Sequence, residues 1–504
     1  MGNLILEAIS QTAKTAPMHL CFDDRQTGET LTYGELEKES DGLAAYFSSK
    51  FSGKEPILVA GGLTKEVLVS FIACMKAGHP YVPVDSHTPA ERIKLIHEEA
   101  EPVCVVAFDQ WEIPAKHLVR LKEFDEIVKK SKSYPSENQV TGDDLTYIIF
   151  TSGTTGKPKG VQISYNNLAS FLQWMMTDFS LAQGQRYLCQ APFSFDLSVM
   201  DVFPALLTGG TLVPLEKDTV DNFPVLFRTL PDLKLNVWVS TPSLIEICLV
   251  TPDFRAGTLP ELSHFLFCGE ELPHKVADKL LERFPQAKIY NTYGPTEATV
   301  AVSGVQITKE ILEKYERLPL GKVKEDTKIY IFDDQDQPLS EGEFGEVVIA
   351  GPSVSRGYFR NADKTAESFF SYQGLPAYRT GDGGYLKDGL LFYQGRLDFQ
   401  IKWHGYRMEL GDIDHHLLSL SSVQKACVVP KYQNHKVQQL IAYVVLEQGE
   451  PENPRETAKA LKGLLKEKLM AYMMPQKFVF ASQLPLTSNG KIDRKQLMAE
   501  VNPS

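Results

Sequence analysis

Short apolar runs alternate with amphipathic segments along most of the chain. The runs PILVAGG at 56–62 and LNVWVS at 235–240 are typical of buried strands. The segment KEVLVSFIACMKAG at 65–78 has the length and spacing of a helix. This alternation predicts an α/β fold in which doubly wound, largely parallel sheets are covered by helices.

The pattern changes at about residue 320. The segments TKIYIFDDQDQPL at 327–339 and GEVVIAG at 345–351 read as short strands separated by turns. They predict a β-rich, barrel-like subdomain over about 320–397 that is attached to the α/β part.

A third pattern follows GRLDFQIK at 395–402. Roughly 100 residues remain after it, which is enough for a small α+β domain. We therefore place a domain boundary at Asp398, with an N-terminal core at 1–397 and a C-terminal domain at 398–504.

Composition narrows the class of protein. The chain has 504 residues, 43% of them hydrophobic, and a formal net charge of -12. Such an acidic balance argues against broad binding to nucleic acid or to anionic lipid, which needs basic patches. Seven scattered cysteines without a CxxC pair indicate reduced thiols. Because the N-terminus lacks a basic leader and no apolar run approaches about 20 residues, we expect a cytoplasmic protein that does not insert into membranes.

The loop TSGTTGKPKG at 151–160 combines hydroxyl groups, glycines and lysines, as a phosphate site requires. It does not fit the motif GxxxxGK[ST], because Thr151 stands where glycine is needed and Pro158 where a hydroxyl is needed. The following residues GVQIS read as a strand, so no helix N-terminus is aimed at the anion. We interpret the loop as a flap between two strands.

Further segments, taken in their order along the chain, indicate the kind of protein that contains this flap. They are KAGHPYVPVD at 76–85 before the flap, then FDLS at 195–198, NTYGPTEATV at 291–300, YRTGD at 378–382, GRLDFQIKWHGYRMEL at 395–410 and NGKIDRK at 489–495. This order resembles the adenylate-forming superfamily of acyl-CoA synthetases, luciferases and amino-acid adenylation enzymes. The resemblance extends over nearly the whole chain.

The resemblance implies binding of ATP and Mg²⁺. Tyr293 would stack on adenine, Asp382 would accept both ribose hydroxyls, Glu297 would bind Mg²⁺, and Lys491 would act as the catalytic lysine between the substrate carboxylate and the α-phosphate. Asp398 matches the hinge of a mobile C-terminal domain. The further nucleotide-binding residues that the resemblance implies are Thr151, Ser152, Gly153, Thr154, Lys157, Asn291, Thr292, Gly294, Pro295, Thr296, Tyr393, Gln394, Gly395 and Arg396.

Asp196 resembles the carboxylate that pairs with the substrate ammonium in amino-acid-activating members. The segments APFSFDLSVMD, FLFCGEEL and NTYGPTEATVAV are most similar to the D-alanine:D-alanyl carrier protein ligases of teichoic acid D-alanylation. This resemblance implies D-alanine as substrate, with Met200, Cys268 and Val300 in its pocket and Lys491 on its carboxylate. The acyl acceptor would be a phosphopantetheine thiol on a D-alanyl carrier protein, supplied in trans because no carrier follows in this chain.

Alternatives remain. A stand-alone adenylating enzyme for another small amino acid in nonribosomal peptide synthesis would carry similar motifs. A nucleotide-binding regulatory protein is disfavoured by Lys491, Glu297 and Asp382, and an acyl-CoA synthetase by Asp196. The run DIDHH at 412–416 has metal-ligand residue types, but its adjacent histidines would point to different faces of a helix, so a metal site is disfavoured.

Overall fold

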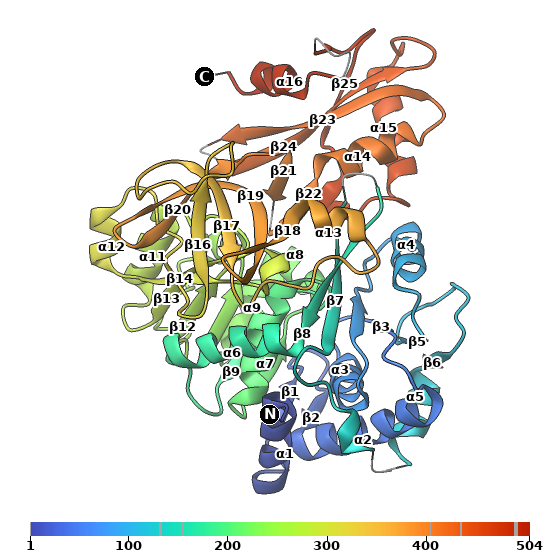
Figure 1. The fold of residues 1–504 in the computed structure, drawn as a ribbon, viewed down its shortest axis with the longest axis vertical. Helices are drawn as coiled ribbons and strands as arrows, with labels where there is room; N and C mark the ends of the chain where they lie inside the picture. The colour runs from blue at the N-terminus through green and yellow to red at the C-terminus, as the bar shows by residue number, and fades with distance from the viewer. Residues whose placement is uncertain are drawn as a thin grey trace. The chain divides into compact units, whose positions relative to one another are not determined.

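The computed structural model describes residues 2–130, 134–153, 156–403, 405–433, 436–487 and 492–503. Two residues with predicted roles, Thr154 and Lys491, lie outside the described residues. The chain divides into two compact units (Figure 1). Unit 1 comprises Met1–Ser86, Ala100–Ile149 and Gly160–Leu397, and unit 2 comprises His87–Glu99, Phe150–Lys159 and Asp398–Ser504.

The helices and strands of the structure have the following bounds. The strands are β1 (Leu20–Asp23), β2 (Thr30–Thr32), β3 (Ile57–Ala60), β4 (Tyr81–Val84), β5 (Cys104–Ala107), β6 (Leu118–Arg120), β7 (Leu145–Thr151), β8 (Lys159–Ser164), β9 (Arg186–Cys189), β10 (Thr211–Pro214), β11 (Val237–Ser240), β12 (His264–Phe267), β13 (Lys288–Tyr293), β14 (Ser303–Ile307), β15 (Lys322–Val323), β16 (Lys328–Phe332), β17 (Gly345–Ala350), β18 (Phe369–Tyr372), β19 (Leu375–Lys387), β20 (Leu390–Arg396), β21 (Gln400–Trp403), β22 (Tyr406–Glu409), β23 (Val423–Gln433), β24 (Lys436–Leu446) and β25 (Lys477–Phe480). The α-helices are α1 (Leu4–Thr15), α2 (Tyr33–Lys50), α3 (Lys65–Ala77), α4 (Ala90–Ala100), α5 (Leu121–Val128), α6 (Tyr165–Asp178), α7 (Val199–Leu207), α8 (Lys217–Asp221), α9 (Phe223–Leu233), α10 (Pro242–Cys248), α11 (His274–Arg283), α12 (Lys309–Lys314), α13 (Ala362–Ser368), α14 (Leu410–Leu418), α15 (Pro454–Leu465) and α16 (Arg494–Val501). The 3-10 helices are η1 (Ser136–Asn138), η2 (Asp196–Ser198), η3 (Thr296–Ala298) and η4 (Ala471–Met473).

The larger sheet of unit 1 has the strand order β15-β14-β13-β12-β11-β9-β10-β1-β2. Its strands from β13 to β1 run parallel. The order reverses at β9, because β10 lies on one side of it and β11 to β13 lie on the other. The predicted doubly wound α/β class is therefore confirmed, and such a reversal leaves a crevice at the carboxyl ends of the strands, where ligands bind.

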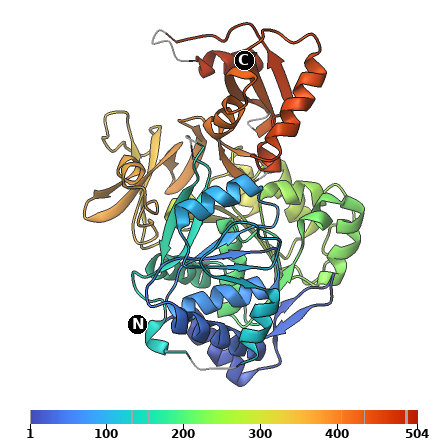
Figure 2. The ribbon, with the colours of Figure 1, turned by 90° about the vertical axis from the view of Figure 1, so that its right-hand side faces the viewer.

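The six-stranded sheet has the order β6-β5-β3-β4-β7-β8, so that β3 lies between β5 and β4. Helices α2 and α3 lie side by side in both ribbon views (Figures 1 and 2). A capping box between Thr32 and Glu35 starts α2. Gly78 ends α3 with a φ of 86°, and a Cβ there would lie 2.4 Å from the carbonyl oxygen of Asn138, so only glycine fits.

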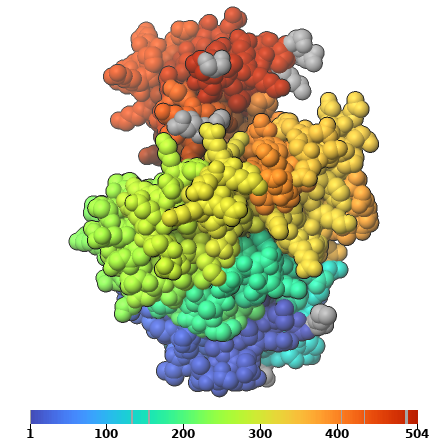
Figure 3. All heavy atoms as spheres, turned by 90° about the vertical axis from the view of Figure 1, so that its left-hand side faces the viewer, coloured from blue at the N-terminus to red at the C-terminus, as the bar shows by residue number. Residues whose placement is uncertain are grey.

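Antiparallel strands β16 to β20 form the β-rich part of unit 1. Their apolar side chains share one buried cluster with residues that follow β13: Ile329, Val347 and Leu391 pack with Ala298 and Val302. On the face shown in Figure 3, the yellow part of the chain adjoins the green part that precedes it. The turn after β13 is therefore held between the large sheet and the β-rich part.

Unit 2 is an α+β unit. It contains the β21–β22 hairpin and the three-stranded sheet β23-β24-β25, packed with α14 and α15 around a shared apolar core. Residues 87–99 and 150–159 also belong to this unit. The sequence prediction of one boundary at Asp398 did not include them, because they join the unit through contacts with residues far away in the sequence. Among the described helices, none is long and apolar enough to cross a membrane.

Candidate active site

Three side chains predicted to bind the nucleotide meet in unit 1. The Tyr293 hydroxyl donates a 2.6 Å hydrogen bond to Oδ2 of Asp382, and Arg396 Nη1 lies 3.0 Å from Oδ1 of the same carboxylate. Asp382 is buried, and burial followed by the charge of Asp382 raises the pKa of Tyr293. The tyrosine therefore stays protonated and donates to a carboxylate that also faces a guanidinium.

Strand register explains this meeting. Asp382 in β19 lies directly opposite Arg396 in the antiparallel neighbour β20, so the two side chains share one face. Arg396 also donates to the carbonyl oxygen of Thr380 at 2.9 Å, and the amide of Asp382 donates to the Thr380 hydroxyl at 3.0 Å. These contacts fix the position of the carboxylate before any ligand arrives.

The end of strand β13 presents a buried acceptor. The side-chain nitrogen Nδ2 of Asn291 donates to the carbonyl oxygen of Pro319 at 2.8 Å. The side-chain oxygen Oδ1 of Asn291 is buried and has no hydrogen-bond donor among the described residues. An acceptor held in this way fits an exocyclic amino group such as that of adenine. The hydroxyl of Thr292 donates instead to the Phe267 carbonyl at 2.8 Å and therefore supports the strand.

The turn that follows β13 folds back tightly on itself. A Cβ on Gly294 would lie 2.5 Å from Cα of Ala301, so glycine is required at that position. Thr299 and Val300 both have positive φ, at 59° and 67°, which is rare for β-branched residues and stores strain. Pro295 and Thr296 connect this glycine to η3.

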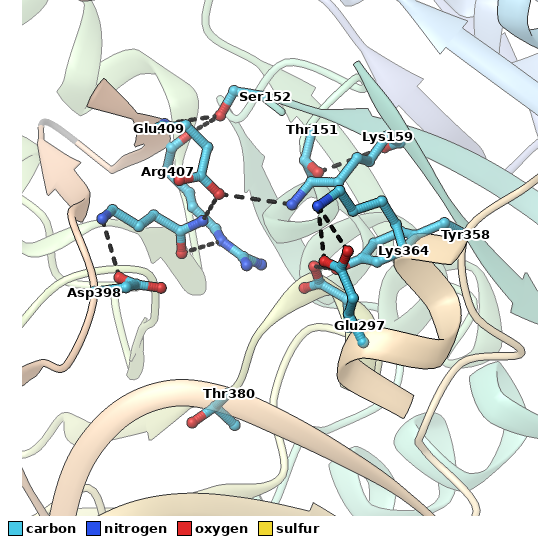
Figure 4. Close-up of polar contacts among 12 residues, drawn as sticks. Thr151, Ser152, Lys159, Glu297, Tyr358, Lys364, Thr380, Asp398, Arg407 and Glu409 are labelled. Atoms are coloured by element: carbon cyan, nitrogen blue, oxygen red, sulfur yellow. Dashed lines mark hydrogen bonds and ion pairs between the residues drawn. The ribbon is translucent and has the colours of Figure 1, made fainter. Parts of the chain in front are cut away.

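Glu297 follows in η3 and is fully buried. Its Oε1 accepts a 2.8 Å hydrogen bond from the hydroxyl of Tyr358 (Figure 4). Magnesium in nucleotide sites is commonly bound by one or two carboxylates, with phosphate and water oxygens as the remaining ligands. A carboxylate oriented by a tyrosine fits that role, and Tyr358 is a site residue for which the sequence offered no signal.

The predicted amino-acid pocket lies near the carboxyl ends of the parallel strands. Asp196 stands at the start of η2 after β9, and Met200 is fully buried in α7. Cys268 follows β12, and its sulfur lies 3.7 Å from the carbonyl oxygen of Val300. The structure therefore brings Cys268 and Val300 together, and Met200 belongs to the same large buried core as both.

Tyr147 is a second residue that sequence reasoning missed. It lies fully buried in β7, and no described group bonds its hydroxyl. Burial raises the pKa of Tyr147, with a further contribution from the negative charge of Asp196.

The phosphate-loop residues that are described belong to unit 2. The Ser152 hydroxyl accepts a hydrogen bond from the amide of Glu409 at 3.1 Å, and it lies 3.4 Å from the carbonyl oxygen of Arg407 (Figure 4). Thr151 directs its hydroxyl to the Lys159 carbonyl oxygen at 3.5 Å. A Cβ on Gly153 would lie 2.1 Å from the carbonyl oxygen of Lys157, so this turn also requires glycine.

The two lysines of the loop differ in environment. Lys157 is exposed and pairs with Glu99 at 3.0 Å, which raises its pKa. Lys159 is largely buried and lies 3.6 Å from Oε1 of Glu409. Lys159 was not among the predicted phosphate ligands, although the loop sequence contains it.

The remaining predicted residues lie near the end of unit 1 and the start of unit 2. Tyr393 stacks with the guanidinium of Arg317 at 5.6 Å, Gln394 is exposed, and Gly395 has a φ of 113° in β20. Asp398 opens the C-terminal segment of unit 2, and its Oδ1 accepts from the amide of Gln400 at 3.0 Å. A hinge at Asp398 stays a prediction.

The DIDHH run forms the middle of α14. Asp412 is buried, with Arg92 Nη1 at 3.7 Å and His416 Nε2 at 3.5 Å from its oxygens. Burial raises the pKa of Asp412 to about 6 and lowers that of His416 to about 4. Among the described residues no group of three or more His, Cys, Asp or Glu side chains could hold a metal ion.

A doubly wound α/β sheet of this kind is typical of enzymes that bind nucleotides. The sequence matches the AMP-binding enzyme family over residues 9–359 and the C-terminal domain of AMP-binding enzymes over residues 412–491. The chain belongs to the AMP-binding enzyme family.

Relatives of known name narrow this assignment. The chain is 47% identical over 503 residues to the D-alanine–D-alanyl carrier protein ligase of Lacticaseibacillus casei, covering 99% of each chain. It is 48% identical over 505 residues to the ligase of the same name from Lactiplantibacillus plantarum, again covering 99% of each. The structure of o-succinylbenzoate CoA synthetase from Bacillus subtilis aligns with a TM-score of 0.83 at 21% identity over 99% of this chain and 98% of that one, which supports the fold alone. The resemblance to this group of ligases is confirmed.

Proposed function

We propose that this chain joins D-alanine to ATP, giving D-alanyl adenylate and pyrophosphate, and then transfers the D-alanyl group to the phosphopantetheine thiol of a separate carrier protein. The observation that carries the proposal is the near-full-length identity of 47% to ligases with this specificity. We further propose that the product serves the D-alanylation of teichoic acids in the cell wall and that the enzyme works in the cytoplasm.

The nucleotide part of the proposal rests on the Asp382 group. Two oxygens of one carboxylate can accept from both ribose hydroxyls, and a carboxylate offers no donor that would compete. Tyr293 and Arg396 already orient that carboxylate at 2.6 and 3.0 Å. Asn291 offers its buried acceptor to the base, and Glu297 would bind Mg²⁺ beside the phosphates.

The first step brings two anions together, because the substrate carboxylate must approach the α-phosphorus of ATP. Countercharge is the main requirement for such a reaction. Asp196 would pair with the D-alanine ammonium, and Lys491 would lie between the carboxylate and the α-phosphate. The phosphate loop, through Thr151, Ser152, Gly153, Thr154 and Lys157, would hold the leaving pyrophosphate.

Pyrophosphate exchange into ATP, measured over a panel of D- and L-amino acids, tests the first step. We expect D-alanine to support the fastest exchange, with L-alanine and glycine slower. Mass spectrometry of a phosphopantetheinylated carrier protein incubated with enzyme, ATP and D-alanine tests the second step. Exchange that is faster with another small amino acid would favour an enzyme of nonribosomal peptide synthesis instead.

A further inference from the structure

The phosphate loop already holds an anion of the protein itself. Glu409, at the end of β22, offers a carboxylate 3.6 Å from the ammonium of Lys159, and its backbone amide donates to the Ser152 hydroxyl at 3.1 Å. Figure 4 shows Ser152 and Lys159 directed toward this one residue from two points of the loop. We propose that Glu409 is a positioning residue that competes with pyrophosphate for the phosphate loop.

The competition follows from the donors available. A serine hydroxyl has one proton to donate, and phosphate oxygens accept hydrogen bonds only. In this structure the Ser152 hydroxyl lies 3.4 Å from the carbonyl oxygen of Arg407, which is an acceptor in the same strand as Glu409. If the Ser152 hydroxyl donates to pyrophosphate instead, the carbonyl oxygen of Arg407 loses its hydrogen bond from Ser152.

Charge acts in the same direction. The Lys159 and Glu409 side chains are 14% and 10% exposed, so water screens their interaction only in part. A pyrophosphate that approaches Lys159 would meet the Glu409 carboxylate and be repelled by it. The hairpin must therefore withdraw its carboxylate before the loop can bind pyrophosphate, and it can return only after pyrophosphate has left.

The hairpin holds Glu409 in position for this role. Gln400 of β21 donates to Oε1 of Glu409 at 2.7 Å, and Gln400 in turn accepts from Arg407 Nε at 2.6 Å. Gln400 and Glu409 lie directly opposite each other in the β21–β22 register. This arrangement makes the carboxylate part of a rigid hairpin rather than of a flexible side chain on the surface.

The inference rests on the proposed function, because it takes the loop to be the place that the leaving pyrophosphate occupies. The hairpin would then block rebinding of pyrophosphate, and so hinder the reverse reaction while the acyl group awaits the thiol.

The test compares Glu409→Gln with Glu99→Gln in the full-length enzyme. Both changes remove one carboxylate that pairs with a lysine of the same loop, but Glu99 pairs with the exposed Lys157. Titration calorimetry with Mg²⁺ and inorganic pyrophosphate should show roughly fivefold tighter binding for Glu409→Gln, the factor that about 1 kcal/mol represents. Glu99→Gln should differ from wild type by less than about twofold, because exposed pairs contribute little.

Hydrogen exchange gives a second readout. Pyrophosphate should speed exchange of the Glu409 amide in the wild-type enzyme and leave the amides paired between β23 and β24 unchanged. Equal pyrophosphate affinity in Glu409→Gln and wild type, or a Glu409 amide that does not respond, overturns the inference. Exchange of pyrophosphate into ATP with D-alanine, measured on the same wild-type sample, reports separately on the proposed function: if it is intact while the hairpin is unresponsive, only the inference fails.

Discussion

Replacing Asp382 with asparagine isolates the charge in the proposed ribose site. The amide keeps the shape of the side chain, but its single oxygen can replace only one of the two oxygens that accept from Tyr293 and Arg396, and it carries no negative charge. Hydrogen bonds to charged groups contribute about 1.5 to 3 kcal/mol each, against about 1 for neutral ones. Since two ribose hydroxyls are affected and the amide recovers part of the loss, we expect the variant to lose about 2 to 3 kcal/mol of binding free energy for ATP.

That free energy corresponds to a KM for ATP raised roughly 30- to 150-fold. The KM for D-alanine should change less than about threefold, because Asp382 is not part of the proposed amino-acid pocket. Initial rates of pyrophosphate release, measured while ATP and D-alanine are varied in turn, provide both constants. Titration with AMP gives an independent dissociation constant that should rise by a similar factor.

The chain offers a matched control in Asp388→Asn. Asp388 accepts from the hydroxyl of Tyr315 at 2.8 Å, just as Asp382 accepts from Tyr293, but it follows β19 in an exposed turn. This variant should retain the KM of the wild type for both substrates. An unchanged KM for ATP in Asp382→Asn, or KM values for ATP and D-alanine that rise together, would refute the assignment of Asp382 to the ribose.

Three other changes test the site, and a fourth tests the pH dependence of stability. Asp196→Asn should raise the KM for D-alanine by a factor that corresponds to roughly 3 to 5 kcal/mol, and that for ATP far less; unchanged D-alanine kinetics would remove Asp196 from the pocket. Lys491→Ala should abolish adenylate formation while transfer from supplied D-alanyl adenylate continues, and equal loss of both half-reactions would contradict this role. Cys268→Ala should increase kcat/KM for L-alanine, within the roughly 10- to 200-fold that one methyl contact controls, and should change kcat/KM for D-alanine little. A D-to-L ratio of pyrophosphate exchange that stays constant would show that Cys268 is a packing residue only. Burial raises the pKa of Asp412 from 3.8 to about 6, so its contribution to stability is present below about pH 4 and is lost as the pH rises through 6. Asp412→Asn should flatten this fall in the free energy of unfolding, measured with urea, by up to about 3 kcal/mol. Parallel pH profiles of variant and wild type would argue against the shift.

The class of fold could be predicted because its signals are local. Alternating apolar strands and helices define parallel sheets, and α3 lies so deep that nearly all its side chains are buried, as its continuous apolar sequence predicts. The sequence could not assign residues 87–99 and 150–159 to unit 2. That grouping depends on contacts such as the one between Arg92 and Asp412, which are separated by more than 300 positions and carry no local pattern.

The sequence offers candidate motif residues for the site, whereas the residues that contact them in the structure leave no signal in the sequence. Tyr358, which orients Glu297, lies in a segment without a distinctive pattern, and its position follows only from the fold of the β-rich part. Tyr147 sits in a plain apolar strand, where a tyrosine is ordinary. The partner of Lys159 is equally remote, because Glu409 is 250 positions away.

The acidic composition of the chain has a counterpart in the phosphate loop. A protein with a net charge of -12 would repel ATP unless positive charge is concentrated where the phosphates bind. The two lysines of the loop supply such charge, but each already faces a glutamate, Lys157 facing Glu99 and Lys159 facing Glu409. If the loop binds polyphosphate as we propose, binding would exchange one anion for another, and the affinity would be the difference between the two interactions. Because the Lys159 pair is largely buried and the Lys157 pair exposed, most of that difference would come from the Glu409 carboxylate.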